Sequence, residues 1–139
     1  MRRLTVVDRT IVLPTLPAAL DGLRIAHVSD LHIGELITPD RLPTIVDLAN
    51  RLRADVIAVT GDFVDYLLNV LTEVIQALGQ LEALLDVFMV RGNHDRLEDG
   101  AHLIERFGNA GLNLLVNKSI ALEYRGNRSS ENTERGSII

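Results

Sequence analysis

Short apolar runs separated by longer amphipathic stretches dominate the middle of this chain. Three of the runs, Leu23–Val28, Val56–Val59 and Val87–Val90, have the length of a strand that is buried on both faces. Between them, apolar residues recur at helical spacing over residues 42–52 and 67–81. A strand, a helix and a second parallel strand together need roughly 30 residues, which is the interval between the runs. The pattern therefore predicts an α/β fold with a mostly parallel sheet built from βαβ units.

The two amphipathic stretches differ in how clearly they begin. Pro43 would clash with the carbonyl group four residues earlier, so the first regular helix is expected to begin near Leu42. The second stretch has no such break at its start, and only Gly79 weakens its last turns. Its apolar face is predicted to consist of Leu67, Leu71, Val74, Ile75, Leu78 and Leu81.

The flanking segments show weaker patterns. Leu4–Leu13 is rich in β-forming residues and predicts a first strand, either at a sheet edge or in a separate sheet. Apolar residues between positions 103 and 107 indicate a third, shorter helix that Gly108 or Gly111 can end. Leu112–Val116 and Ile120–Tyr124 predict two further strands joined by a turn at residues 117–118.

The end of the chain lacks this patterning. Residues 126–137 contain no apolar side chain, so the segment cannot bury enough surface to offset the entropy lost on ordering. We therefore expect one domain over residues 1–125 and a disordered polar tail over residues 126–139.

Composition narrows the chemistry. The chain has no cysteine, so any metal must be held by oxygen and nitrogen, which suits divalent ions such as Mn, Mg, Fe or Zn. The formal net charge is −5 and no basic stripe is present, which argues against nucleic acid as a partner. Asp8 and Arg9 interrupt the N-terminal apolar run, so no signal peptide is expected. No apolar stretch approaches the roughly 18 residues of a membrane span, and we expect a soluble, cytoplasmic protein.

Metal-binding residue types follow each of the three central strands. Asp30 and His32 follow the first, Asp62 the second, and Asn93 and His94 the third. Successive parallel strands joined by right-handed crossovers align their carboxyl ends, and ligands of such sheets gather there. We therefore expect these five side chains to face one crevice.

Read together, these loops carry Asp-x-His, Gly-Asp-x-x-Asp and Gly-Asn-His-Asp in this order. Over roughly residues 23–124, the chain closely resembles the calcineurin-like metallophosphoesterases. Its motifs are similar to those of small bacterial phosphohydrolases, some of them membrane-associated and some acting on lipid-linked phosphate. The resemblance implies hydrolysis of a phosphomonoester or phosphodiester by a hydroxide held between two metal ions, and it adds peripheral membrane association as an option for a cytoplasmic protein.

The resemblance also implies a ligand set. Asp30 and His32 would bind the first of two divalent ions (Mn, Fe, Zn or Mg), Asp62 would bridge both ions, and Asn93 would bind the second through its amide oxygen. Two neighbouring cations need a shared carboxylate to offset their repulsion, and together they clamp the attacking and leaving oxygens of a phosphoryl displacement. Gly61 and Gly92 lack a β-carbon, so the backbone can turn sharply beside the ions.

Other residues near the motifs have supporting or purely structural interpretations. By the same resemblance, His94 would be the general acid, and Asp95 could fix its tautomer and orientation. Asp65 could orient a ligand or cap the following helix, and the cap is slightly favoured. His27 is interpreted as a packed, hydrogen-bonded strand residue and His102 as a solvated helix residue.

The chain also departs from the family pattern. Family members continue with a further His and a Gly-His-x-His motif, whereas the four histidines here lie at positions 27, 32, 94 and 102. The implied fold is therefore the N-terminal part of a four-layer α/β/β/α sandwich, with the chain interpreted as truncated. The alternative is a catalytically inactive remnant, or a metal- or phosphate-binding module. A flavodoxin-like nucleotide-binding module is less favoured, because no glycine-rich loop follows the first strand.

The strands also set an expectation about surface. They are apolar on both faces, yet only three helices and a short hairpin are available to cover them. Some apolar surface should therefore be exposed, and self-association through it is expected.

Overall fold

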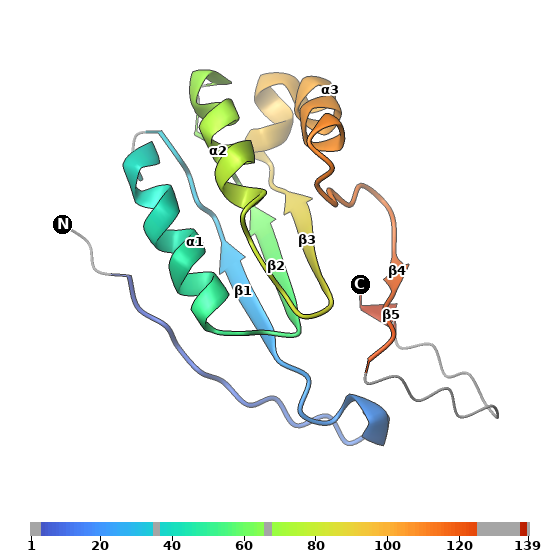
Figure 1. Ribbon diagram of the computed structural model, residues 1–139. Coiled ribbons are helices and arrows are strands. Elements are labelled where there is room, and N and C mark those ends of the chain that lie inside the picture. The colour runs from blue at the N-terminus through green and yellow to red at the C-terminus, as the bar shows by residue number, and fades with distance from the viewer. Residues whose placement is uncertain (1–3, 35–36, 66–67, 125–136, 139) are drawn as a thin grey trace.

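A parallel sheet of three strands forms the centre of the molecule. The computed structural model describes residues 4–34, 37–65, 68–124 and 137–138. The strands are β1 (Ile25–Ser29), β2 (Val56–Gly61) and β3 (Asp86–Arg91), in the spatial order β1-β2-β3 (Figure 1). Each strand overlaps one of the three apolar runs, and the predicted α/β class with a parallel sheet is confirmed.

The register of the sheet aligns the strand ends. Val28 lies opposite Val59, which lies opposite Met89, and Ser29 lies opposite Thr60. All three arrowheads therefore point to the same edge of the sheet, and the three motif loops leave from that edge (Figure 1).

Two helices cover one face of the sheet (Figure 1). Helix α1 (Leu42–Arg51) begins at the predicted residue, after the 3-10 turn η2 (Pro39–Arg41). Helix α2 (Leu71–Leu78) follows the 3-10 turn η3 (Leu68–Val70). The residues that these two helices bury are Leu42, Val46, Ala49, Leu71, Val74, Ile75 and Leu78. They recur at the spacing that the sequence predicted, because each helix presents one apolar stripe to the sheet.

Helix α3 (His94–Asn109) differs from the prediction, because it begins directly after the third motif loop and is the longest helix of the described residues. The prediction of a short helix was therefore wrong. Its first turns contain no run of apolar residues, so the hydrophobic pattern reveals only its second half. There, Leu103 and Phe107 are buried, and the Phe107 ring packs 5.0 Å from the ring of Phe63.

The face of the sheet opposite α1 and α2 is largely open. Along β1, Ile25, His27 and Ser29 are exposed, whereas Ala26 between them is buried. Side chains of a strand alternate between its two faces, so these exposed residues share the uncovered face. Ile25 is 47% exposed and Val90 of β3 is 42% exposed, which confirms that apolar surface remains uncovered.

Two predicted pairings are absent from the described residues. Leu4–Leu13 has no strand partner there and contains only coil. The hairpin of Leu112–Val116 with Ile120–Tyr124 is also wrong, because Leu114 instead bridges Met89 of β3 in parallel. Apolar and β-forming residues predict that a segment is extended. Tertiary contacts decide which strand that segment pairs with.

The C-terminal region contributes one short pairing. Strand β4 (Ile120–Ala121) pairs antiparallel with β5 (Ser137–Ile138). In the part of the chain that the structure describes, this pair and the central sheet are the two sheets of the fold. The predicted tail and the boundary at residue 125 lie outside the described residues, apart from the two residues of β5. Among the described residues, no helix has both the length and the hydrophobicity to cross a bilayer.

Candidate metal centre

The loops that follow β1 and β2 remain hydrogen-bonded to each other beyond the strands. The backbone N–H of Asp30 donates to the Thr60 carbonyl at 2.9 Å, and that of His32 donates to the Asp62 carbonyl at 3.0 Å. Ile33 forms a parallel bridge with Val64, and both side chains are buried. The polar residues of the two loops are thus held side by side by a continuation of the sheet.

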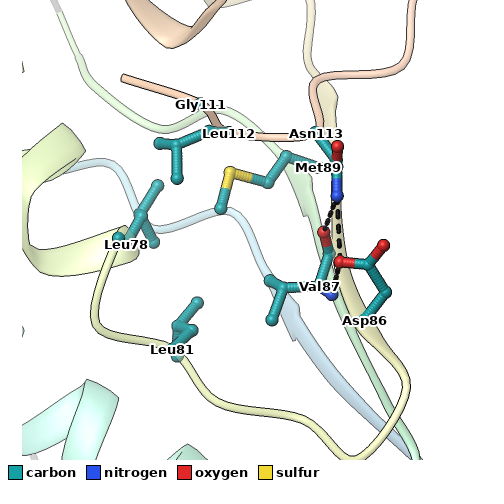
Figure 2. Close-up of a pocket in the computed structure, with 9 residues that line it drawn as sticks. Leu78, Leu81, Asp86, Val87, Met89, Gly111, Leu112 and Asn113 are labelled. Carbon is teal, nitrogen blue, oxygen red and sulfur yellow. Dashed lines mark hydrogen bonds between the residues drawn. The ribbon is translucent and has the colours of Figure 1, made fainter.

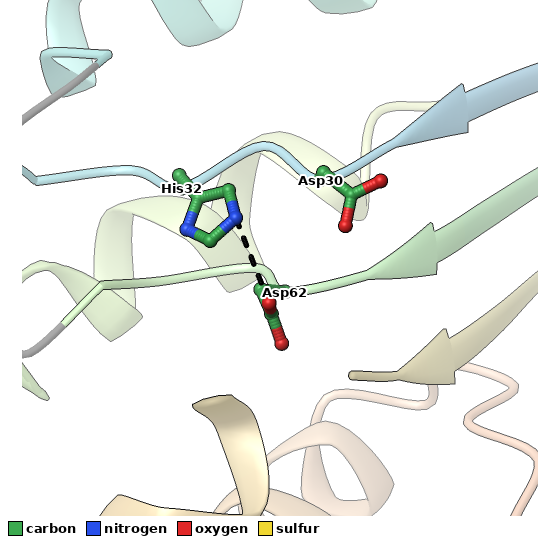
Figure 3. A group of neighbouring side chains, drawn as sticks. All are labelled: Asp30, His32 and Asp62. Carbon is green, nitrogen blue, oxygen red and sulfur yellow. Dashed lines mark ion pairs between the residues drawn. The ribbon is translucent and has the colours of Figure 1, made fainter. Parts of the chain in front are cut away.

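Three predicted ligands meet at this point. One ligand atom from each of Asp30, His32 and Asp62 lies within 4.8 Å of the others (Figure 3). The Nε2 atom of His32 is 3.5 Å from Oδ2 of Asp62. Asp62 is buried, His32 is partly buried and Asp30 is exposed, so the group extends from the interior of the molecule to its surface. Two carboxylates and an imidazole suit a hard or borderline divalent cation.

The backbone of the first loop adopts an uncommon conformation. Asp30 has a φ of 52° and His32 a φ of 43°. Residues with a β-carbon rarely adopt this left-handed region, although Asp, Asn and His do so more often than most. Asp30 and His32 lie side by side along the first loop, and the imidazole of His32 faces Asp62 (Figure 3).

Two glycines make room for the carboxylates. A β-carbon at Gly61, whose φ is +82°, would lie 2.5 Å from Oδ1 of Asp30. A β-carbon at Gly92 would overlap the Asp62 carboxylate and lie 2.7 Å from the backbone nitrogen of Asp62. Together with the donor set, this close packing of carboxylates against bare backbone fits a metal site.

Asp65 contacts one of the three predicted ligands. Its Oδ1 atom lies 2.5 Å from Nδ1 of His32, and its side chain is buried. An Nδ1–H group donated to Asp65 leaves the Nε2 lone pair of His32 directed toward Asp62. This contact is the one that the orienting interpretation of Asp65 requires, whereas the start of the segment that Asp65 would cap lies outside the described residues, so both roles stay predictions.

The third loop approaches Asp62 through its backbone. The N–H of His94 donates to Oδ1 of Asp62 at 2.8 Å. The imidazole of His94 packs edge-on against that of His32, with ring centroids 5.4 Å apart. Asn93 directly precedes His94 and is exposed at the start of α3. The structure therefore places His94 beside the three-residue group, whereas the roles of Asn93 and His94 stay predictions.

Asp95 is placed differently from the expectation that it orients His94. Its side chain is 1% exposed, and its carboxylate accepts hydrogen bonds from the backbone N–H of Gly92 at 2.9 Å and of Phe63 at 3.0 Å. Burial raises the pKa of Asp95, although these hydrogen bonds act in the opposite direction. The sequence carries no signal for the contact with Phe63, because it depends on how the second and third loops pack.

The other two histidines lie away from the metal centre. His27 lies on the open face of β1, where its Nε2 is 2.7 Å from Oγ1 of Thr60. It is hydrogen-bonded as predicted, but it is exposed rather than packed. His102 is exposed on α3, in agreement with its interpretation as a solvated residue.

A cavity of about 190 Å³ lies near the opposite end of β3. Leu78, Leu81, Met89 and Leu112 line its apolar side, and Asp86 is hydrogen-bonded at its edge (Figure 2). None of the three metal-site residues lines it. The candidate metal centre at the carboxyl ends of the strands is therefore separate from this cavity.

Comparison with known proteins identifies relatives of this chain. A Danio rerio protein named "Transmembrane protein with metallophosphoesterase domain" is 37% identical over 90 residues, which cover 65% of this chain and 21% of the relative. An "Uncharacterized metallophosphoesterase" of Aquifex aeolicus is 28% identical over 119 residues, 86% of this chain and 45% of the relative. A Bacillus subtilis protein, "Uncharacterized metallophosphoesterase YkuE", is 30% identical over 109 residues, 75% of this chain and 37% of the relative. The chain thus spans less than half the length of these relatives.

A family comparison agrees with these matches. The model of the calcineurin-like phosphoesterases matches residues 23–136, which include all three motif loops and most of the chain. On this evidence, the chain belongs to the calcineurin-like phosphoesterase family.

Proposed function

We propose that this chain carries metal-binding residues of a phosphoesterase that hydrolyses a phosphomonoester or a phosphodiester. The observation that carries the proposal is the convergence of Asp30, His32 and Asp62 within 4.8 Å at the carboxyl edge of the sheet. These residues come from two loops, and a further residue, Asp65, contacts the imidazole of His32. An aspartate that only caps a helix or a strand end accepts hydrogen bonds from nearby backbone N–H groups. That role does not require three side chains from two loops to lie close together.

Each of the proposed ligands would bind one or both of two divalent ions. Asp30 and His32 would hold one divalent ion, Asn93 would hold a second, and Asp62 would contact both. Divalent ions, with Mn²⁺ as our preferred candidate, supply Lewis acidity toward the phosphoryl oxygens and acidify water. Asp62 supplies negative charge between the two sites, and the backbone N–H of His94 fixes its Oδ1 atom at 2.8 Å.

His94 is the proposed general acid. Its imidazole lies beside that of His32 and is only partly buried. A partly buried imidazole next to the metal centre can protonate the leaving oxygen of a substrate. The hydrogen bond from the backbone N–H of His94 to Asp62 keeps the His94 backbone beside the metal centre.

An aryl phosphate ester and Mn²⁺ test the proposal directly. We expect turnover by the wild-type chain to fall by about two to four orders of magnitude in His94→Ala, the usual range for a general acid. The exposed His102 offers a matched control, and His102→Ala should retain full turnover. Equal turnover by His94→Ala and wild type would remove His94 from the mechanism.

A binding module without turnover is the second candidate. It is favoured by the number of proposed ligands, because four protein ligands shared between two ions leave both sites open. Mn²⁺ uptake without any hydrolysis would support this candidate over the enzyme.

We further propose that the chain self-associates through the open face of its sheet. The exposed Ile25 and Val90 support this proposal, because exposed apolar patches commonly mark association sites. Light scattering over a concentration series should show a rising mass that Ile25→Lys and Val90→Lys reverse. A constant monomeric mass for the wild type would contradict it.

The cellular location of the protein is proposed as well. We propose a cytoplasmic protein with the option of peripheral contact with a membrane. The name of the Danio rerio relative, which describes a transmembrane protein, supports proximity to a membrane. Co-sedimentation with anionic lipid vesicles tests the peripheral contact, and recovery of all the protein in the supernatant would contradict it.

A further inference from the structure

The second and third motif loops exchange aspartates. Asp62 of the second loop accepts a hydrogen bond from the backbone N–H of His94 in the third loop, at 2.8 Å. Asp95 of the third loop accepts one from the backbone N–H of Phe63 in the second, at 3.0 Å. His94 directly precedes Asp95, and Phe63 directly follows Asp62. Each aspartate thus accepts a hydrogen bond from the sequence neighbour of the other. We call this reciprocal pair the Asp62–Asp95 exchange.

Burial shows that the exchange is a fixed part of the structure. Asp62 is 5% exposed and Asp95 is 1% exposed. Buried carboxylates are retained only where hydrogen bonds or opposite charges offset the loss of hydration. The backbone donors of the two loops provide those hydrogen bonds, so neither loop can shift without leaving a buried carboxylate without its donors.

Gly92 connects the exchange to the metal centre. Its N–H donates to Oδ2 of Asp95 at 2.9 Å, and it lies where a β-carbon would overlap the Asp62 carboxylate. Asp95 therefore binds the backbone of Gly92, which leaves space for the Asp62 carboxylate. It also binds the backbone of Phe63, which directly follows Asp62. Both contacts restrict the position of the Asp62 carboxylate.

We propose that Asp95 is a positioning residue that acts through backbone groups on either side of the metal centre. By binding Phe63 and Gly92, it fixes the Asp62 carboxylate and the backbone of His94 in the places that ligand and general acid require. The consequence for metal uptake rests on the function proposed above, whereas the coupling of the two loops does not.

Amide hydrogen exchange measured by NMR on the full chain without metal tests the coupling. In Asp95→Asn and Asp95→Ala, the amides of Phe63 and Gly92 should lose protection because their acceptor changes. The decisive amide is that of His94, whose acceptor is the unaltered Asp62. We expect its protection to fall about tenfold, as loss of a buried hydrogen bond implies.

Asp86→Asn is the matched control, because Asp86 accepts the backbone N–H of Val87 at the other end of β3. It should leave the His94 amide unchanged, and the amide of Val59 within the sheet should be unchanged in every variant. Loss of protection confined to Phe63 and Gly92, or an equal loss at His94 in Asp86→Asn, would overturn the proposal. If the alanine variant fails to fold, the isosteric asparagine variant gives the same comparison.

Calorimetry with Mn²⁺ tests the consequence. Asp95→Asn should bind Mn²⁺ about tenfold more weakly, the lower end of the effect of losing a residue that orients a ligand. Asp86→Asn should bind it within about twofold of the wild type, in line with ordinary surface changes. Equal binding by Asp95→Asn and wild type would overturn the positioning role. A wild type that takes up no Mn²⁺ would instead contradict the proposed function, and the His94 amide would still decide the coupling.

Discussion

At the amino end of the central sheet, Asp55 accepts a hydrogen bond from the backbone N–H of Arg24, and Asp86 accepts one from that of Val87. At the carboxyl end, Asp62 accepts a hydrogen bond from the backbone N–H of His94, and Asp95 accepts one from that of Phe63. The residue type and the kind of partner are the same. The two ends differ in what surrounds the carboxylates.

Asp55 and Asp86 are only partly buried. Asp62, Asp65 and Asp95 are all buried, and Asp30, Asp62 and Asp65 concentrate acidic groups around His32. Such concentration destabilises a folded chain unless a cation or hydrogen bonds offset it. Clustering and burial, and not the mere presence of aspartates at strand ends, therefore distinguish a candidate functional site from a structural turn.

The largest effect is expected when one carboxylate is removed from the carboxyl end of the sheet and, for comparison, one from the amino end. Asp62→Ala should abolish Mn²⁺ uptake, because Asp62 is the proposed shared donor. Asp86→Ala, the matched change at the amino end, should leave uptake unchanged. Calorimetry measures both, and uptake that is equal in the two variants would remove the distinction between the ends.

A smaller change keeps the ligands and removes an orienting group. Asp65→Asn replaces the carboxylate that lies 2.5 Å from Nδ1 of His32. Loss of such partners typically lowers metal affinity by about 10- to 100-fold, and we expect an effect in that range. Asp55→Asn should have no effect on Mn²⁺ affinity, and an equal loss in both variants would indicate general destabilisation.

Packing against the carboxylates gives a third test. Gly92→Ala places a methyl group on Asp62 and should lower the free energy of unfolding by about 1–3 kcal/mol, as overpacking does. Gly108 lies in α3, and among the described residues no neighbouring atom comes within 4 Å of the place that a β-carbon would take there. Gly108→Ala should therefore raise the free energy of unfolding by about 0.5–1 kcal/mol. Urea denaturation measures both, and a neutral Gly92→Ala would contradict the tight packing.

The smallest effect is expected at the amino end. The side-chain amide of Asn113 donates to Oδ1 of Asp86 at 2.9 Å. The same amide also donates to the Val87 carbonyl, but this contact is long at 3.4 Å. Asn113→Ala should therefore lower the free energy of unfolding by about 0.5–1.5 kcal/mol, the net value of one good hydrogen bond. Mn²⁺ affinity should not change, and a measurable loss of affinity would show that the two ends are coupled.

Local patterns predicted the central sheet because its strands are apolar runs of the right length. They also predicted the meeting of Asp30, His32 and Asp62, since parallel strands align their carboxyl ends. The first half of α3 was missed, because packing at the third loop starts it, while its residues lack an apolar stripe. The strand partner of Leu114 was missed because Met89 is distant in sequence.

The roles of Asp65 and Asp95 show a different limit. An aspartate just after a strand can cap a helix, orient a ligand or bind backbone groups of another loop. Each role is compatible with the same neighbouring residues. Only the packing of the loops distinguishes them, since it brings Asp65 to His32 and Asp95 to Phe63.

The left-handed backbone at Asp30 and His32 has a consequence for how such a sequence can change over time. Glycine adopts this conformation without strain, so Asp30→Gly and His32→Gly would relieve the backbone while removing the ligands. At His32 this relief is opposed, because glycine would leave the buried Asp65 carboxylate without the imidazole. Asp30 is exposed, so backbone strain favours glycine there and the proposed ligand role opposes it. In a lineage that no longer needs the metal, Asp30 should therefore drift before His32.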